Sequence, residues 1–163
     1  MQIRRCVPED WSDIRRLHVK LALSFPAVVD VDLNQVFSMP DDFWKNFVRT
    51  GAGARDQALF VAEVDGRVVG MGHGDVQGDL ARLDLVYVEG DQRRRRVASG
   101  LVEALCGWAE SSGAVRIVSH IAQTSEGSKV AAALGWAMSD EVTFTKSGLE
   151  EHKWVAPGSE AGF

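Results

Sequence analysis

An Asp-Gly pair between two apolar runs is the feature that most constrains the fold of this sequence. Asp65 and Gly66 separate residues 58–64 from residues 67–73, and both runs are rich in Val, Ala and other small or apolar residues. Asp-Gly favours a tight two-residue turn, because both central positions of such a turn need a positive φ. The segment therefore predicts an antiparallel β-hairpin, and with it a sheet on which the other elements pack.

The remaining elements are predicted on both sides of this hairpin from apolar periodicity and turn residues. Strands are expected at Ile3 and over residues 81–88, 115–121 and 141–146, and helices over residues 8–24, 40–49, 97–112 and 127–134, the last closed by Gly135. Interleaved helices and strands favour an α+β fold, with a mixed, mostly antiparallel sheet of about six to seven strands flanked by about four helices. Residues 1–147 form the predicted single domain, and residues 148–163 a polar C-terminal tail.

Composition and charge argue against several classes of protein. The chain has 163 residues, which is the length of one ordinary domain. Its 18 Lys and Arg against 23 Asp and Glu give a net charge of −5, so no nucleic-acid partner is expected. No apolar run is long enough to cross a membrane, and Cys6 and Cys106 lack the spacing of a zinc site or a disulfide framework. We therefore expect a cytoplasmic protein with reduced thiols, no metal and no membrane partner.

The segment over residues 85–101 carries the strongest functional signal. A predicted strand leads into a short loop, which leads into an amphipathic helix, and the loop holds four consecutive arginines, Arg93, Arg94, Arg95 and Arg96. Unpaired N–H groups and the macrodipole at a helix start attract anions, and guanidinium groups pair with phosphate. The segment therefore predicts a pyrophosphate site. A solvated basic loop and an RNA-binding loop are the alternatives for the same arginines.

With this segment the sequence resembles the GCN5-related N-acetyltransferase (GNAT) family. The family signature Gln/Arg-x-x-Gly-x-Gly/Ala falls on Arg93, Arg96 and Ala98, and the predicted order of elements agrees over residues 3–146. The later family pattern Asn-x-x-Ala-x-x-x-Tyr-x-x-x-Gly-Phe falls on Thr124, Gly127, Ala131, Gly135 and Trp136. Two positions depart from the family: Arg96 stands where it has a central Gly, and Ala131 where it commonly has a general-acid Tyr.

The resemblance implies an acyltransferase. Acetyl-CoA, or another acyl-CoA, would be the co-substrate, and the acyl group would pass directly to a primary amine of a small molecule or to a protein amino group. The implied cofactor-binding residues are Val86, Tyr87, Val88, Arg93, Arg94, Arg95, Arg96, Val97, Ala98, Ser99 and Thr124. A non-catalytic module that binds CoA or a partner protein is the alternative function. Exposed sheet edges near the C-terminus would favour a homodimer in this fold.

Three residues are candidates for the general base that direct transfer to an amine requires, since only the neutral amine attacks. Asp84 and Glu89 lie in or just after one predicted strand, and His120 lies in the next strand along the chain. Asp84 has the strand parity of Val86 and Val88, which places these three residues on a common face if no bulge intervenes. The sequence leaves the choice among the three candidates open.

The sequence gives fewer indications of where the acceptor amine would bind. Residues 30–42 contain Asp but no Lys or Arg, so they form either a solvated acidic loop or an entrance that attracts a cationic amine. Trp44, with Phe43 and Phe47, fits the wall of a substrate pocket as well as a core anchor. His73 lies in an apolar strand, where a hydrogen-bonded structural histidine is the usual interpretation.

Overall fold

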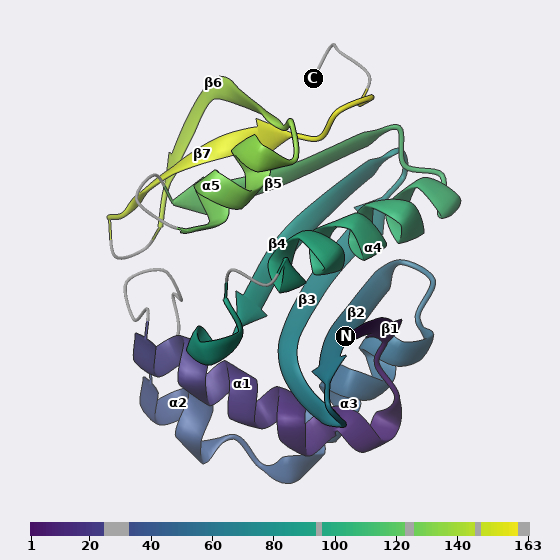
Figure 1. The fold of residues 1–163 in the computed structure, drawn as a ribbon, viewed down its shortest axis with the longest axis vertical. Helices are drawn as coiled ribbons and strands as arrows, with labels where there is room; N and C mark the ends of the chain where they lie inside the picture. Colours follow the sequence, from purple (N-terminus) through teal and green to yellow (C-terminus); the bar gives the residue numbers. More distant parts are fainter. Residues whose placement is uncertain (25–32, 94–95, 123–125, 146–147, 160–163) are drawn as a thin grey trace.

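The computed structural model describes residues 1–24, 33–93, 96–122, 126–145 and 148–159. In these residues a seven-stranded sheet runs in the order β1-β2-β3-β4-β5-β7-β6, with helices packed on it (Figure 1). The strands are β1 (Gln2–Arg5), β2 (Gln57–Val64), β3 (Arg67–Gln77), β4 (Leu80–Val88), β5 (Arg116–Ala122), β6 (Ala137–Phe144) and β7 (Glu150–Val155). The helices are α1 (Trp11–Ser24), α2 (Leu33–Ser38), α3 (Asp41–Gly53), α4 (Val97–Ser111) and α5 (Glu126–Ala133). Short 3-10 helices, Pro8–Asp10 and Gly90–Gln92, precede α1 and α4.

The sheet is mixed, as the sequence predicted. β4 and β5 pair in parallel, whereas every other neighbouring pair of strands is antiparallel. The predicted turns are also present: Asp65 and Gly66 have φ values of 50° and 77° between β2 and β3, and Gly135 has a φ of 79° after α5. The α+β class and the mostly antiparallel sheet are therefore confirmed.

Helices α1 and α3 cover one face of the sheet. Ile14 and Leu17 of α1 and Val48 of α3 are fully buried, and they join one apolar cluster with Leu59 of β2 and Met71 of β3. Burial of an aliphatic side chain of this size stabilises the fold by about 1.5–3 kcal/mol. The cluster therefore fixes α1 and α3 against the central strands.

Helix α4 covers the opposite face and lies close to β3. A Cβ atom at Gly72 would lie 2.9 Å from Cδ1 of Leu105, and one at Gly70 would lie 3.2 Å from Cδ1 of Leu101. At both glycines an added side chain would crowd a leucine of α4, so their small size allows the helix to approach β3 closely. Ala131 of α5 shares a cluster with Leu105, so α5 lies on the same face as α4.

The C-terminal segment differs from the prediction of a polar tail over residues 148–163. Glu150–Val155 form β7, which lies between β5 and β6 and pairs with both. The polar sequence hides this strand because its side chains are only half buried. Nε2 of His152 lies 2.8 Å from Oε1 of Glu150, and Lys153 forms an ion pair with Glu141. Pairing of the backbone on both sides, which no hydrophobic pattern reports, holds the strand in the sheet.

Two other elements differ in extent from the prediction. α2 lies within the segment that the sequence predicted to be a loop, and β6 begins at Ala137 rather than at Glu141. Large apolar side chains at Met138, Val142 and Phe144 are exposed on β6, the outermost strand at this end of the sheet. None of the described helices combines the length and the apolar character that a membrane span requires.

Candidate functional site

β4 and β5 separate along their length, as Figure 1 shows. Their parallel ladder joins Leu80–Arg82 to Arg116–Val118, and the described residues add no further pair to it. Beyond this point β4 stays paired with β3 as far as Val88, while β5 pairs with β7 on its other side. On the side that faces β5, the last part of β4 therefore has N–H and C=O groups that do not pair with β5. These groups belong to the residues that directly precede the arginine loop.

A bulge in β4 lies at the point where the two strands separate. His73 of β3 pairs with Leu85, but the next residue, Gly74, pairs with Leu83, so Asp84 is the extra residue of β4. The bulge reverses the alternation of side chains. Leu83 packs in the cluster under α4, whereas Leu85 packs against the cluster under α1 and α3.

The predicted common face of Asp84, Val86 and Val88 is therefore wrong. Val88 packs in a cluster with Leu101 of α4, and Val86 lies two residues before it in the regular part of β4. Asp84 instead contacts His73, whose ring lies against the α3 side of the sheet. The bulge directs the Asp84 carboxylate toward the face that α1 and α3 cover.

Asp84 forms an accessible pair with His73. The distance from Nδ1 of His73 to Oδ1 of Asp84 is 2.7 Å, and the Asp84 side chain is 57% exposed whereas that of His73 is 12% exposed. The ring of His73 lies 5.7 Å from the ring of Phe47 on α3, centroid to centroid. The imidazole is thus held within the protein, and the carboxylate in front of it faces solvent.

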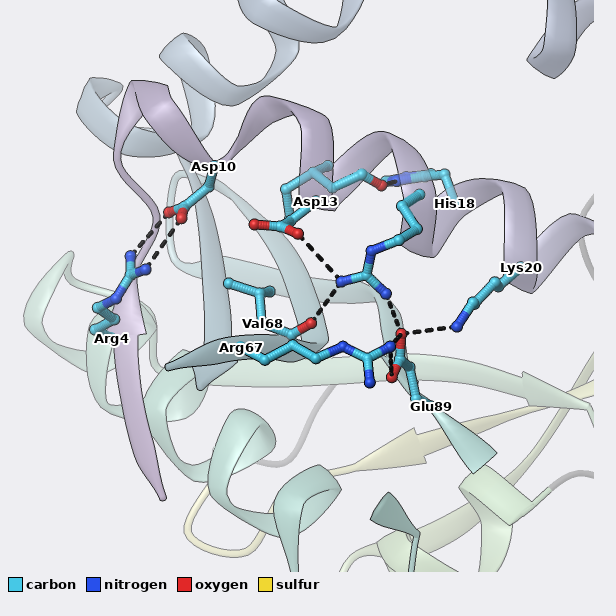
Figure 2. A network of polar contacts seen from close by, with 10 residues as sticks. Arg4, Asp10, Asp13, His18, Lys20, Arg67, Val68 and Glu89 are labelled. Carbon is cyan, nitrogen blue, oxygen red and sulfur yellow. Dashed lines mark hydrogen bonds and ion pairs between the residues drawn. The ribbon is translucent and has the colours of Figure 1, made fainter. Parts of the chain in front are cut away.

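Glu89, which directly follows β4, is buried where Asp84 is exposed. It is only 2% exposed, and its carboxylate binds three cationic side chains, those of Arg16, Lys20 and Arg67 (Figure 2). Nζ of Lys20 lies 2.9 Å from Oε1, and Nη2 of Arg67 lies 3.0 Å from Oε2. Arg16 also donates to the backbone oxygen of Val68 at 2.7 Å. The cluster ties the end of β4 to α1 and to the start of β3.

Electrostatics keep Glu89 ionised. Burial by itself would raise the pKa of Glu89, but hydrogen bonds from Lys20 and Arg16 and the charges of both outweigh burial, so the pKa is lowered. The Glu89 N–H also donates to the backbone oxygen of Val69 at 2.9 Å. The residue is therefore bound at both its backbone and its side chain, directly before the loop that leads to α4.

The start of α4 has backbone donors that the helix itself does not use. The first hydrogen bond within the helix runs from the N–H of Gly100 to the oxygen of Arg96, at 3.1 Å, and no side chain of Arg96 caps the helix. The N–H groups of Val97, Ala98 and Ser99 precede this bond, so they have no acceptor within the helix. A helix of 15 residues with uncapped donors at its start can bind an anion such as a pyrophosphate.

Arg96, at the position of the central Gly in the family signature, has a left-handed backbone. Its φ is 61° and its ψ is 20°, a conformation that costs a residue with a Cβ atom about 1–2 kcal/mol and that Gly adopts readily. Arg96 adds a guanidinium group at the helix start, at the cost of local strain.

Of the four predicted cofactor-binding arginines, the structure also describes Arg93. Nε of Arg93 donates to the backbone oxygen of Val88 at 3.1 Å, and its guanidinium carbon lies 5.8 Å from the centroid of the Tyr87 ring. Arg93 thus lies against the end of β4. Arg94, Arg95 and Thr124 lie outside the residues that the structure describes.

The sequence of the central region matches a known family model. Residues 25–136, more than half of the chain, match the model of the Acetyltransferase (GNAT) family. The chain belongs to the GNAT acetyltransferase family. No curated protein sequence matches the chain at a significant level.

Solved structures of GNAT proteins share the fold of this chain. The protein YncA from Salmonella typhimurium, solved with acetyl-CoA, is 18% identical, covers 100% of this chain and 96% of its own, and has a TM-score of 0.77. The PaiA N-acetyltransferase from Thermoplasma acidophilum, in complex with coenzyme A, is 12% identical over 95% and 97%, with a TM-score of 0.76. The ribosomal-protein-alanine N-acetyltransferase from Brucella melitensis is 18% identical over 95% and 98%, with a TM-score of 0.71.

Two predicted positions of this GNAT protein lie beyond the point where β4 and β5 separate, His120 on β5 and Ala131 on α5, which contacts β5. Nε2 of His120 lies 3.9 Å from Oε1 of Glu141 on β6. Ala131, at the family's Tyr position, is buried in an apolar cluster with Trp136. The single tyrosine of the sequence, Tyr87, packs in the cluster under α1 and α3. Ala131 itself cannot donate a proton to a leaving thiolate.

The structure adds residues that the sequence did not associate with the site. His73 was interpreted as a structural histidine, and the partners of Glu89 were not anticipated. The position of His73 beside Asp84 could have been predicted. The tight β3–β4 connection pairs Gln77 with Leu80, and regular pairing counted back from there places positions 73 and 84 opposite each other. The partners of Glu89 could not be predicted in this way, because Arg16 lies 73 residues away in the sequence.

Proposed function

We propose that this protein is an acyl-CoA-dependent N-acyltransferase, with acetyl-CoA as the acyl donor and a primary amine of a small molecule or protein as the acceptor. The observation that carries the proposal is the start of α4, where uncapped N–H groups follow directly on the end of the diverging strand β4. This arrangement can bind a diphosphate at the helix and an extended chain along the strand. Membership of the GNAT family supports the same activity.

In this proposal the chain's own residues bind the donor in two ways. The N–H groups of Val97, Ala98 and Ser99 bind the pyrophosphate, and the arginines over residues 93–96 supply positive charge beside it. Backbone groups of Val86, Tyr87 and Val88 bind the pantetheine arm. A backbone amide at this position can also donate to the thioester oxygen, which develops negative charge during acyl transfer.

Asp84 is the proposed general base, because it combines position with access. Its carboxylate is exposed at the bulge where β4 leaves β5, whereas Glu89 is buried among three cations and His120 is on β5, beyond the point where the two strands separate. The proton of the acceptor ammonium passes to Asp84, directly or through water, and the neutral nitrogen attacks. The C–N bond forms as the C–S bond breaks, and the acylated nitrogen loses its second proton to solvent. The thiolate takes its proton from water, since position 131 is Ala.

Isothermal titration with acetyl-CoA and with CoA tests the donor site. Arg96→Glu is expected to weaken binding at least about tenfold, because it replaces a charge-assisted contact by repulsion. Arg49→Glu makes the same change of charge on α3, where the Arg49 guanidinium donates to Oδ1 of Asn46 at 2.9 Å, and is expected to leave affinity unchanged. Failure of the unmodified protein to bind either compound at millimolar concentration would refute the proposal.

A thiol-release assay tests the reaction. The acceptor panel contains a peptide with N-terminal alanine, a lysine peptide, a polyamine and an aminoglycoside, and acetyl-CoA is the donor. Amine-dependent release of CoA above hydrolysis supports acyl transfer. Binding of acetyl-CoA with no turnover on any of these amines would favour a non-catalytic CoA-binding module, which the loss of the family's Tyr at Ala131 also allows.

A further inference from the structure

We infer that His73 is a positioning residue that holds the Asp84 carboxylate in the orientation needed for proton abstraction, an inference that rests on the proposed function. The two side chains meet across the β3–β4 hairpin, with Nδ1 of His73 2.7 Å from Oδ1 of Asp84. A carboxylate oxygen accepts, so Nδ1 carries the proton of this hydrogen bond. Oδ2 of Asp84 has no hydrogen-bond partner among the described residues, and it is the oxygen left for the acceptor amine.

The pair lies at a local irregularity of the sheet. Regular pairing would place Asp84 directly opposite His73, but the bulge pairs His73 with Leu85 and leaves Asp84 as the extra residue beside it. The backbone of β4 is therefore bent at the residue that carries the base. Because a bulged residue lacks one regular ladder partner, its side chain depends on other contacts for a defined orientation.

The imidazole is itself held in place. Phe47 lies between two histidine rings: its centroid is 5.7 Å from that of His73, at an interplanar angle of 31°, and 5.4 Å from that of His18, at 88°. His18 is in turn fixed by a hydrogen bond between its Nδ1 and the backbone oxygen of Ile14 at 3.0 Å. His73 is thus a packed ring that can fix Asp84, whereas Asp84 alone is an exposed side chain with free rotation about its χ angles.

The consequence for catalysis concerns orientation. A base that must meet an ammonium proton within hydrogen-bond distance loses rate when its rotamer is not fixed, and a displacement of about 1 Å can reduce the rate about 100-fold. His73 therefore contributes to kcat through Asp84 and not to the affinity for acetyl-CoA. A purely structural histidine would contribute to stability alone.

Two variants of His73 separate these roles. His73→Leu keeps an apolar side chain against Phe47 but removes the donor, and His73→Asn keeps an N–H donor near the position of Nδ1. With the most active amine of the panel, we expect His73→Leu to lower kcat about 10- to 100-fold with an unchanged Kd for acetyl-CoA. His73→Asn is expected to restore kcat to within about threefold of the unmodified protein. Thermal unfolding of both variants monitors the fold.

A double-mutant cycle completes the test. If His73 acts through Asp84, His73→Leu has no further effect on kcat in an Asp84→Asn background. Additive losses, an unchanged kcat in His73→Leu, or a loss in His73→Asn equal to that in His73→Leu would each overturn the inference while the proposed function stands. Absence of turnover by the unmodified protein would instead refute the proposed function, and the role of His73 with it.

Discussion

Asp84 lies in β4 and Glu89 directly follows the same strand, five residues later, and the sequence offers both as candidates for the general base. Their surroundings differ in every respect that matters for such a role. Asp84 is exposed and has one imidazole partner, whereas Glu89 is buried and has three cationic partners. The comparison shows that the surroundings of a carboxylate decide whether it is suited to exchange a proton or to anchor the chain.

Asp84 and Glu89 differ in this way because their carboxylates accept different numbers of hydrogen bonds. Three charged donors stabilise the ionised form of Glu89 and lower its pKa, which makes it a poor proton acceptor near neutral pH. They also join α1 and β3 to the end of β4, directly before the loop that leads to α4. The Glu89 cluster thus anchors the chain directly after β4, whereas the carboxylate of Asp84, the proposed base, stays accessible.

The largest effect is expected from Asp84→Asn. The substitution keeps the size of the side chain but removes the base, so kcat should fall by roughly 10³-fold, about 4 kcal/mol in activation free energy. Asp79→Asn is the matched control, since Asp79 is 58% exposed on the same hairpin and pairs with Arg116 at 3.0 Å. Steady-state kinetics with saturating acetyl-CoA measure both variants. An Asp84→Asn variant as active as Asp79→Asn would show that Asp84 is not the base.

Glu89→Gln should affect stability first. Removal of one partner from a buried ion cluster typically costs about 3 kcal/mol, because the remaining charges lose their compensation. Glu126→Gln is the control: Glu126 pairs with Lys129 at the surface, where a pair contributes about 0–1 kcal/mol. Urea denaturation compares the two variants. Equal and small losses would mean that the Glu89 cluster does not anchor the loop.

A smaller effect is the pH dependence of the contribution that Glu89 makes to the free energy of unfolding. Because the pKa of Glu89 is lowered in the folded state, the unfolded chain binds more protons, and the contribution is fully present above the unfolded pKa of about 4.3. It is lost as pH falls through the folded pKa. The free energy of unfolding of the unmodified protein should therefore approach that of Glu89→Gln as pH is lowered below about 4. A difference that grows on acidification would contradict the lowered pKa.

The smallest effect is expected from Arg96→Gly, which tests the strain in the loop that the Glu89 cluster anchors. Removal of the left-handed penalty should stabilise the protein by about 0.5 kcal/mol, because the greater flexibility of Gly in the unfolded chain offsets part of the gain. The same substitution in a Glu89→Gln background should recover a similar amount. Destabilisation by Arg96→Gly would indicate that the Arg96 side chain, not the cluster, holds the loop.

The sequence predicted the parts of the fold whose signals are local. The Asp65-Gly66 turn, the strand over residues 81–88 and the helix that follows the arginine loop each depend on neighbouring residues, and each is present. β7 was missed because its polar sequence is supported by backbone pairing on both sides rather than by an apolar face. The face of Asp84 was wrong because one extra residue reverses the alternation of a strand, and no residue type announces a bulge.

The sequence by itself determined the family, the order of elements over residues 40–146 and the identity of the residues that carry charge near the start of α4, because these follow from local pattern and spacing. Only the tertiary structure decided which of the candidate carboxylates is exposed and which is buried in an ion cluster. That decision depends on partners distant in the sequence: Arg16 and Lys20 reach Glu89 from 73 and 69 residues away. Burial and charge pairing are properties of the assembled chain, so the same type of side chain acquires a different chemistry at each position.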